Sequence, residues 1–297
     1  EIAPDGILGF NIMVATKEYA QYVKEAVKAG ADVIISGAGL PVDMPKYVKE
    51  AEGQEDCSVR KTMIAPIVSS VKSAMVICKM WDRKYKTAPD FVVIEGPCAG
   101  GHLGFSREQL TEYGADTKEV AKTYEKEKYD GEIRGIIELV KSFAEKYGKK
   151  IPVISAGGVF DHQDVLHQME LGADGVQAAT RFVTTEECDA PMAYKQAYLD
   201  AKEEDIVIVK SPVGMPGRAI KNKFLERIAQ GPLKVEWCFR CLEHCNPAQV
   251  PYCITKALIN AAEGRIDDAL LFCGSNAYRC RQIETVEDVM RDLCGEM

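Results

Sequence analysis

Six short apolar runs, most of them followed by a helical pattern, constrain the fold of this chain more than any other feature. The runs lie at residues 7–14, 32–36, 64–68, 91–94, 151–155 and 175–178. Strands that alternate with helices predict βαβ units and a parallel sheet. Runs that are apolar throughout are typical of strands covered on both faces. Because a closed (β/α)8 barrel needs eight units, six runs leave either an incomplete barrel or an open doubly wound sheet.

One step of this alternation is longer than the others and contains residues 105–132, which are rich in charge. We expect this insertion to be either a lid over the neighbouring turn or a solvated surface loop. Beyond Thr185 the pattern changes, and only residues 206–209 suggest another extended segment. From Lys221 onward the pattern predicts mostly helix. We therefore expect an α/β barrel segment at 1–218, and a helical, cysteine-rich segment at 219–297 that packs on it.

A glycine-rich turn, Glu95-Gly-Pro-Cys-Ala-Gly-Gly-His-Leu-Gly, follows the fourth run directly. Gly100 and Gly101 allow the backbone to approach a ligand closely and to adopt positive φ. A histidine on such a turn is placed to meet a substrate, so we predict that His102 is catalytic; a purely structural histidine is the alternative. For Glu95 three roles are open: binding hydroxyl groups of a ligand, orienting His102, or pairing with a cation.

The last two runs both end in small residues. These residues are Ser155, Ala156, Gly157 and Gly158 after one run, and Ala178, Ala179 and Thr180 after the next. In α/β barrels the loops after the last two strands often bind phosphate through backbone N–H groups. We predict a phosphate site here; the alternative is that the glycines only turn the chain. Asn11, a polar residue in the first run, is either a ligand contact or a core amide with its own partners.

Four of the eleven cysteines, Cys238, Cys241, Cys245 and Cys253, are close in sequence. Such density is compatible with zinc or an iron–sulfur cluster, but cysteine also packs well as a small apolar residue. The second interpretation is favoured, so no metal is predicted. Many cysteines without an export signal suggest a reducing, cytoplasmic location.

The charge pattern and the apolar runs exclude two classes of partner. With 37 Lys and Arg against 45 Asp and Glu, and no basic run, nucleic acid is not an expected partner. No apolar run reaches the roughly 20 residues that span a bilayer, so no membrane partner is expected either.

Taken in order, the Glu95–Gly104 turn, the Ile-Ser-Ala-Gly-Gly-Val stretch and Gly-Ala-Asp-Gly-Val-Gln-Ala-Ala-Thr-Arg-Phe resemble motifs of the nitronate monooxygenases, formerly called 2-nitropropane dioxygenases. Flavin-type enoyl-acyl-carrier-protein reductases are related to them. The resemblance runs from about Gly9 to about Arg218 and implies an FMN-dependent TIM barrel. It makes His102 the active-site histidine and Asn11 a flavin contact. It assigns Gly157, Gly158, Ala179 and Thr180 to the phosphate of FMN, although Ala179 stands where the family pattern has glycine.

The function implied by the resemblance is oxidation of alkyl nitronates by O₂ to a carbonyl compound and nitrite. One alternative is an NAD(P)H-dependent reductase of enoyl thioesters; another, of a different class, is a non-redox barrel enzyme that binds a phosphate. The substrate is a small molecule in each case, and a homodimer is a further expectation. Family members begin with two βα units that nothing here matches, so we expect an incomplete barrel that holds FMN poorly.

Overall fold

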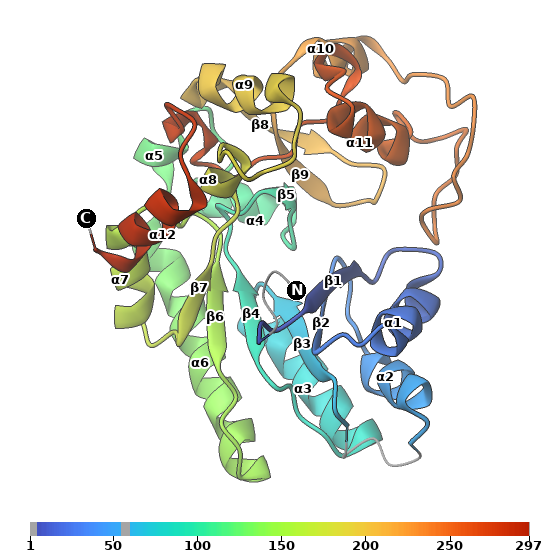
Figure 1. The fold of residues 1–297 in the computed structure, drawn as a ribbon, viewed down its shortest axis with the longest axis vertical. Coiled ribbons are helices and arrows are strands. Elements are labelled where there is room, and N and C mark those ends of the chain that lie inside the picture. The colour runs from blue at the N-terminus through green and yellow to red at the C-terminus, as the bar shows by residue number, and fades with distance from the viewer. Residues whose placement is uncertain (1–4, 55–59, 297) are drawn as a thin grey trace.

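The main element of the computed structural model, which describes residues 5–54 and 60–296, is a curled parallel sheet of six strands. The strands, in their spatial order, are β1 (Gly9–Met13), β2 (Val33–Gly37), β3 (Met63–Val68), β4 (Val92–Glu95), β6 (Val153–Ala156) and β7 (Gly175–Gln177). All five neighbouring pairs are parallel. The six strands predicted from the apolar runs are therefore confirmed, and they form a half-barrel (Figure 1). Residues 1–4 lie outside the described residues.

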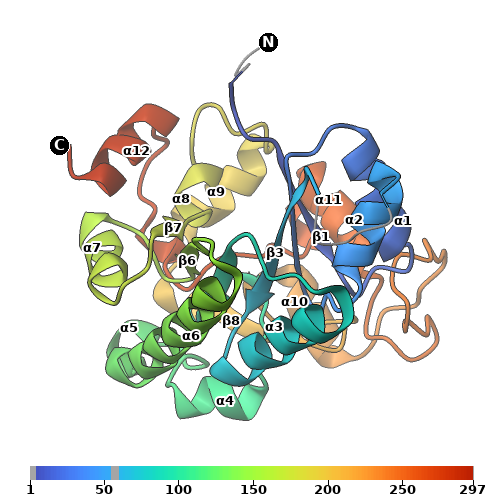
Figure 2. The same ribbon diagram turned by 90° about the horizontal axis from the view of Figure 1, so that it is seen from below.

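Helices cover the outer face of this sheet (Figures 1 and 2). They are α1 (Tyr19–Lys28), α2 (Met44–Glu52), α3 (Val71–Tyr85), α6 (Lys126–Tyr147) and α7 (His162–Glu170), while the short α8 (Thr180–Val183) lies at the carboxyl end of β7. Two apolar cores lie between helices and strands, one around Ile34 and Trp81 and the other around Ile94 and Ile136, all of them fully buried. Full burial of each such side chain contributes about 1.5–3 kcal/mol, so the outer helices hold the strands rigidly below the site. No helix of the described residues is long and apolar enough to cross a membrane.

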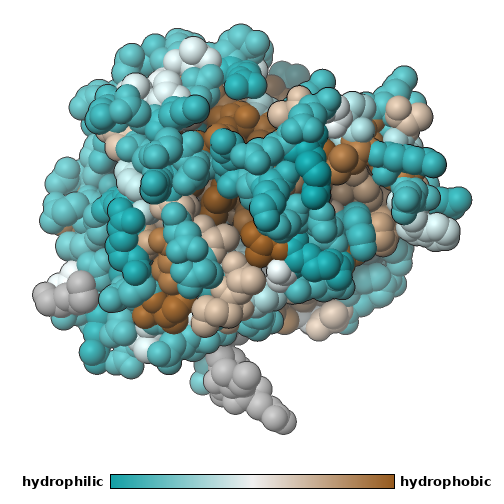
Figure 3. All heavy atoms as spheres, turned by 90° about the horizontal axis from the view of Figure 1, so that it is seen from above, coloured by the Kyte–Doolittle hydropathy of each residue, from teal (hydrophilic) through white to brown (hydrophobic). Residues whose placement is uncertain are grey.

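β1 differs from the other strands because it lies at an edge of the sheet. Gly9, Phe10 and Asn11 are all exposed, and the preceding Ile7 and Leu8 are 72% and 51% exposed. The expectation that every apolar run is covered on both faces is therefore wrong for β1, since β2 is its only strand partner among the described residues. Figure 3 shows apolar patches at the surface between hydrophilic side chains.

A second, antiparallel sheet lies above the carboxyl ends of the six strands (Figure 1). It consists of β5 (Gly101–His102), β9 (Pro216–Ile220) and β8 (Ile206–Lys210), in that order. The helices α9 (Met192–Asp200), α10 (Lys223–Gln230) and α11 (Ile254–Ala262) surround it, and a 3-10 turn, Glu203–Asp205, precedes β8. We call β5 together with residues 192–280 the upper lobe. The extended segment predicted at 206–209 is confirmed as β8.

The segment that follows β9 contains less helix than expected. Helix beyond Lys221 is limited to α10, α11, α12 (Val286–Cys294) and the 3-10 turns Ile266–Asp268 and Ala277–Arg279. Residues 231–253 contain no helix, so the prediction of a mostly helical segment is wrong. Prolines at 232, 247 and 251 explain the difference, because proline removes a backbone donor and disrupts a helix interior.

The insertion after the glycine-rich turn is shorter than predicted and is packed against the barrel. It carries α4 (Arg107–Glu112) and α5 (Val120–Thr123), and the boundary predicted at Glu132 is wrong because residues 126–132 are the first turns of α6. Phe105 and Leu110 are buried in the same core as Ile136. The charged side chains Glu108, Lys118 and Glu119 are exposed, so the segment is a surface insertion with buried apolar anchors. Its role as a lid stays a prediction.

Candidate active site

A cavity of about 440 Å³ lies at the carboxyl ends of the six strands, below the upper lobe. All the residues predicted to contact a ligand, except Ser155, line this cavity. They are Asn11, Glu95, Gly100, Gly101, His102, Ala156, Gly157, Gly158, Ala178, Ala179 and Thr180. Parallel strands bring their carboxyl ends to one edge of a sheet, which explains why motifs far apart in sequence meet here.

Ser155 is the exception, because its side chain belongs to the other face of β6. Its hydroxyl is buried and donates a 2.6 Å hydrogen bond to Oε1 of Gln168 on α7. Successive side chains of a strand point to opposite faces, so Ala156 lines the central cavity while the Ser155 hydroxyl is bonded on the side of α7. That hydroxyl is therefore not available to a ligand in the central cavity.

The Gly157-Gly158 turn presents backbone N–H groups rather than side chains. Both glycines have positive φ, 94° and 86°, and a Cβ on Gly157 would lie 2.9 Å from the backbone nitrogen of Ala99. Within the described ranges, the N–H groups of Gly157, Gly158, Ala179 and Thr180 meet no carbonyl or side-chain acceptor. Gly157, Gly158 and Thr180 are half-buried and Ala179 is exposed, and an anion at this edge of the cavity would supply an acceptor for their N–H groups. The residues present therefore fit a phosphate group.

His102 is held by the upper lobe, not by the sheet that precedes it in sequence. β5 pairs with β9 so that His102 is opposite Gly217. Its Nε2 lies 2.7 Å from the hydroxyl oxygen of Ser211, and its ring packs edge-on to Phe272 with centroids 4.8 Å apart. Burial lowers the pKa of His102 to about 4, so the imidazole is neutral near pH 7.

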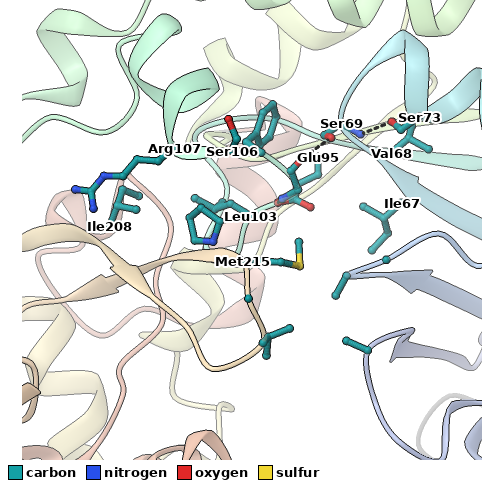
Figure 4. Close-up of a pocket in the computed structure, with 18 of the residues that line it drawn as sticks. Ile67, Val68, Ser69, Ser73, Glu95, Leu103, Ser106, Arg107, Ile208 and Met215 are labelled. Carbon is teal, nitrogen blue, oxygen red and sulfur yellow. Dashed lines mark hydrogen bonds between the residues drawn. The ribbon is translucent and has the colours of Figure 1, made fainter. Parts of the chain in front are cut away.

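Glu95 lies at the carboxyl end of β4, between this cavity and a larger one of about 820 Å³. Its Oε1 accepts a 3.1 Å hydrogen bond from the N–H of Gly104, and burial raises its pKa to about 7. Among the described residues it makes no hydrogen bond with His102, so the predicted orienting role has no support. Figure 4 shows the Glu95 carboxyl group between Ser69 on the barrel side and Met215 of the β8–β9 hairpin.

The two glycines before His102 serve different purposes. A Cβ on Gly100 would lie 2.5 Å from the backbone carbonyl carbon of Cys273, so this glycine permits close packing of the upper lobe. Gly101 has φ of 70° with no atom near its Cβ position. Only Gly101 therefore borders open space at the cavity.

Arg218 on β9 supports the site, and the sequence reasoning did not find it. Its guanidinium group is buried and donates to the carbonyl oxygens of Pro97 (3.0 Å), Ala99 and Ala115 (2.6 Å). These contacts fix the turn that leads to His102. The only signal in the sequence is a charged residue in the short stretch Pro-Gly-Arg-Ala-Ile, which is weak.

Three further residues of the upper lobe were missed. They are Ser211 and Phe272, which contact His102, and Asn276, whose Nδ2 donates a 2.7 Å hydrogen bond to the carbonyl oxygen of Gly158. All three lie more than a hundred residues from their partners, and none belongs to a motif that predicts such a contact.

The four clustered cysteines lie elsewhere, around a small cavity of about 140 Å³ in the upper lobe. Burial raises the pKa of Cys245, and the nearby thiols of Cys241, Cys238 and Cys253 raise it further. In the described part of the chain, no three His, Cys, Asp or Glu side chains are grouped so that they could hold a metal ion.

The fold and this cavity define an α/β protein of the barrel type, with a ligand site at the carboxyl ends of parallel strands. The chain belongs to the nitronate monooxygenase family, whose sequence model matches residues 2–296. The predicted family is thus confirmed, and it is a family of oxidoreductases.

A probable nitronate monooxygenase of Staphylococcus saprophyticus is 27% identical over 205 residues, which cover 69% of this chain and 50% of that protein. One from Staphylococcus aureus is 34% identical over 145 residues, covering 49% of this chain and 35% of that protein. The chain thus spans at most about half the length of these curated relatives.

Solved structures share the fold at low sequence identity. FabK from Thermotoga maritima superposes with a TM-score of 0.68 at 24% identity, covering 98% of this chain and 76% of that one. A nitroalkane oxidase from Streptomyces ansochromogenes gives 0.60 at 18% identity, with coverages of 93% and 68%. The enoyl reductase domain of MlnA from Bacillus amyloliquefaciens gives 0.63 at 13% identity, with coverages of 97% and 80%. At these identities the similarity supports the fold alone.

Proposed function

We propose that the chain uses FMN to oxidise alkyl nitronates with O₂, giving a carbonyl compound and nitrite. The observation that carries this proposal is a neutral, half-buried histidine in the same cavity as a row of backbone N–H groups without acceptors in the described residues. Family membership supports the reaction class. Neither the substrate nor FMN itself is fixed by that membership.

The residues that would hold FMN divide by the part of the cofactor they suit. The N–H groups of Gly157, Gly158, Ala179 and Thr180 suit the phosphate, and Asn11 and Gly101 border the rest of the cavity. When bound, FMN supplies an electron acceptor that the protein side chains lack. Asn276 stabilises the phosphate end indirectly, because it holds the carbonyl of Gly158.

His102 suits the role of hydrogen-bond donor better than the role of base. A pKa of about 4 leaves it neutral but makes it a weak proton acceptor near pH 7. A ring N–H aimed at the nitro oxygens would stabilise their charge at low cost in reorganisation. A nitronate, which has already lost its α-proton, is therefore a better substrate for this site than the neutral nitroalkane.

Glu95 is the group that would allow slow turnover of neutral nitroalkanes. Its pKa of about 7 is close to the operating pH, as a general base requires. It also borders both cavities, so a substrate in the larger one can reach it. Oxidation of neutral nitroalkanes should accordingly depend on Glu95, and oxidation of nitronates should not.

Reduction of an enoyl thioester by NAD(P)H is the second candidate. The cavity of about 820 Å³ beside the central one favours it, because that cavity is large for a small nitronate. Val68, Leu103 and Phe105 give it an apolar wall that an acyl chain would suit. The fold shared with the MlnA enoyl reductase domain is compatible with this alternative.

One anaerobic experiment separates the two candidates. The purified protein, with its flavin bound, is mixed with a nitronate or with NAD(P)H, and bleaching of the flavin absorption is followed in a stopped-flow instrument. Rapid bleaching by the nitronate alone is expected. Rapid bleaching by NAD(P)H alone would establish the reductase, and a protein without flavin absorption would exclude both.

Two predictions from the sequence concern the whole protein and stay predictions. The first is that FMN binds poorly without two upstream βα units. Flavin content compared between this chain and a version extended by about 70–80 residues, the length of two such units, tests it; equal content would contradict it. The second is a homodimer, which sedimentation measurements would test.

A further inference from the structure

The segment 231–253, which we call the cysteine segment, connects α10 to α11 without a helix. Loops longer than about 12–15 residues that lack secondary structure are usually functional or disordered. Within this segment and at its end are Cys238, Cys241, Cys245 and Cys253. The middle of the segment is exposed, with Trp237 at 74% and Phe239 at 42%, whereas Tyr252 near its end is buried.

All four cysteines line one cavity of about 140 Å³, and all four thiols are free. The rest of the wall is largely apolar, with Val235, Leu242 and Ile254 among the residues that form it. Four thiols around one small cavity form a complete set of soft ligands. Thiols that served only as small apolar packing residues would have no reason to converge on an open space.

The backbone between the first two cysteines is arranged to support a sulfur ligand. Arg240 has φ of 53°, a conformation that residues with a side chain seldom adopt. In this conformation its N–H donates to Sγ of Cys238 at 3.4 Å. Hydrogen bonds from the backbone to ligand sulfurs orient the ligands and tune metal centres. If Cys238 is a ligand, the strained conformation of Arg240 serves to place a hydrogen-bond donor on the ligand sulfur.

The cysteine segment is also attached to the barrel next to the candidate active site. The N–H of Lys17 donates to the carbonyl of Cys241, and the N–H of Glu243 donates to the carbonyl of Ala15, both at 3.1 Å. These bonds join it to the turn just after β1, whose residues Asn11 and Met13 line the central cavity. Figure 1 shows the segment extending from α10 and α11 down to this turn.

We propose that Cys238, Cys241, Cys245 and Cys253 bind a four-iron, four-sulfide cluster. Three cysteines separated by two and three intervening residues, and a fourth after seven more, form one compact run, as in cluster proteins. Structural zinc sites more often join two separated pairs of ligands. The absence of any grouping around a single point in the described residues also disfavours one ion. In a cluster each thiolate binds a different iron, so the sulfurs stand farther apart. Each thiol releases its proton as it binds.

The test is metal and sulfide analysis of the intact chain, expressed and purified without oxygen. Roughly four irons and four acid-labile sulfides per chain are expected, as in clusters held by four cysteines. Reduction with dithionite should then produce an electron paramagnetic resonance signal. Sulfide analysis separates a cluster from flavin, which also absorbs visible light.

Variants assign the ligands. Cys238→Ala combined with Cys245→Ala should lose iron and sulfide together, whereas Cys294→Ala, at the exposed end of α12, should keep both. If the double variant does not fold, Cys253→Ser and reconstitution of the wild type with ferrous iron and sulfide answer the same question. About one zinc per chain without sulfide would overturn the proposal. So would failure of the wild type to take up iron and sulfide on reconstitution.

Discussion

The six-stranded sheet and the upper lobe contribute to the candidate site in different ways. The sheet contributes backbone N–H groups at the ends of β6 and β7, where small residues leave the main chain accessible. The upper lobe contributes side chains: Ser211 and Phe272 hold His102, and Arg218 fixes the turn before it. Under the proposed function, cofactor binding depends on local backbone geometry, whereas catalysis depends on packing between distant segments. Each prediction below perturbs one side of this comparison.

The largest effect is expected from Arg218→Met. The change leaves carbonyl oxygens of Pro97, Ala99 and Ala115 without their donor in a buried environment. We expect a loss of about 3 kcal/mol in the free energy of unfolding, measured by urea denaturation. Arg227→Met, which removes an exposed ion pair with Asp268, is the matched control and should cost less than about 1 kcal/mol. Equal losses in the two variants would contradict a special role for Arg218.

A comparison of His102→Ala with His102→Gln addresses catalysis. If His102 is a donor, alanine should lower kcat for a nitronate by on the order of 100-fold per bound flavin. Glutamine retains an N–H and should recover much of that loss. Flavin content should stay constant in both variants, because the phosphate end of the site belongs to the sheet. Similar, low turnover in both would instead point to a role that glutamine cannot fill.

Gly157→Ala tests the sheet side. Positive φ costs a residue with a side chain about 1–2 kcal/mol, and here the new methyl group also meets the backbone nitrogen of Ala99. At Gly148 φ is also positive, but no atom lies near the Cβ position. Gly148→Ala therefore measures the cost of positive φ alone. The variant Gly157→Ala should therefore be the less stable of the two and should retain less flavin. Unchanged flavin retention would show that the turn is not a phosphate loop.

The smallest effect is the pH dependence of stability, because two half-buried groups, Glu95 and His102, change it in opposite directions. Burial raises the pKa of Glu95 from 4.5 to about 7, so its stabilising contribution is complete below pH 4.5 and is lost as pH rises to 7. Burial lowers the pKa of His102 from 6.5 to about 4, so its contribution is complete above pH 6.5 and is lost as pH falls to 4.

In the wild type, the loss of stability from Glu95 as pH rises is partly cancelled by the gain from His102. Glu95→Gln should therefore gain stability relative to the wild type as pH rises from 4.5 to 7, by on the order of 1 kcal/mol, because Glu95 is partly exposed and solvent screens the full effect. Urea denaturation at a series of pH values measures this difference. A difference that does not change with pH would mean that Glu95 is not buried as described.

Much of the sheet was predictable from the sequence because its signals are local. The apolar runs gave β1 through β7 apart from β5, and the Gly157-Gly158 turn was visible as a glycine pair after a strand. The pairing of β5 with β9 was not predictable, since Gly101 and Arg218 lie far apart in sequence. For the same reason, the contacts of Ser211 and Phe272 with His102 were not predictable. Cys238 and its neighbours were visible as a cluster, but their convergence on one cavity required the structure.

The pairing of β5 with β9 also sets an order of assembly during synthesis. His102 leaves the ribosome long before Gly217, its partner across the ladder. Domains fold as their segments emerge, and contacts between distant segments form late. The strands of the sheet up to β7 can pair before residues 216–220 exist, but the histidine cannot take its place. The nascent protein thus acquires its proposed phosphate-binding loops first and its proposed catalytic histidine last.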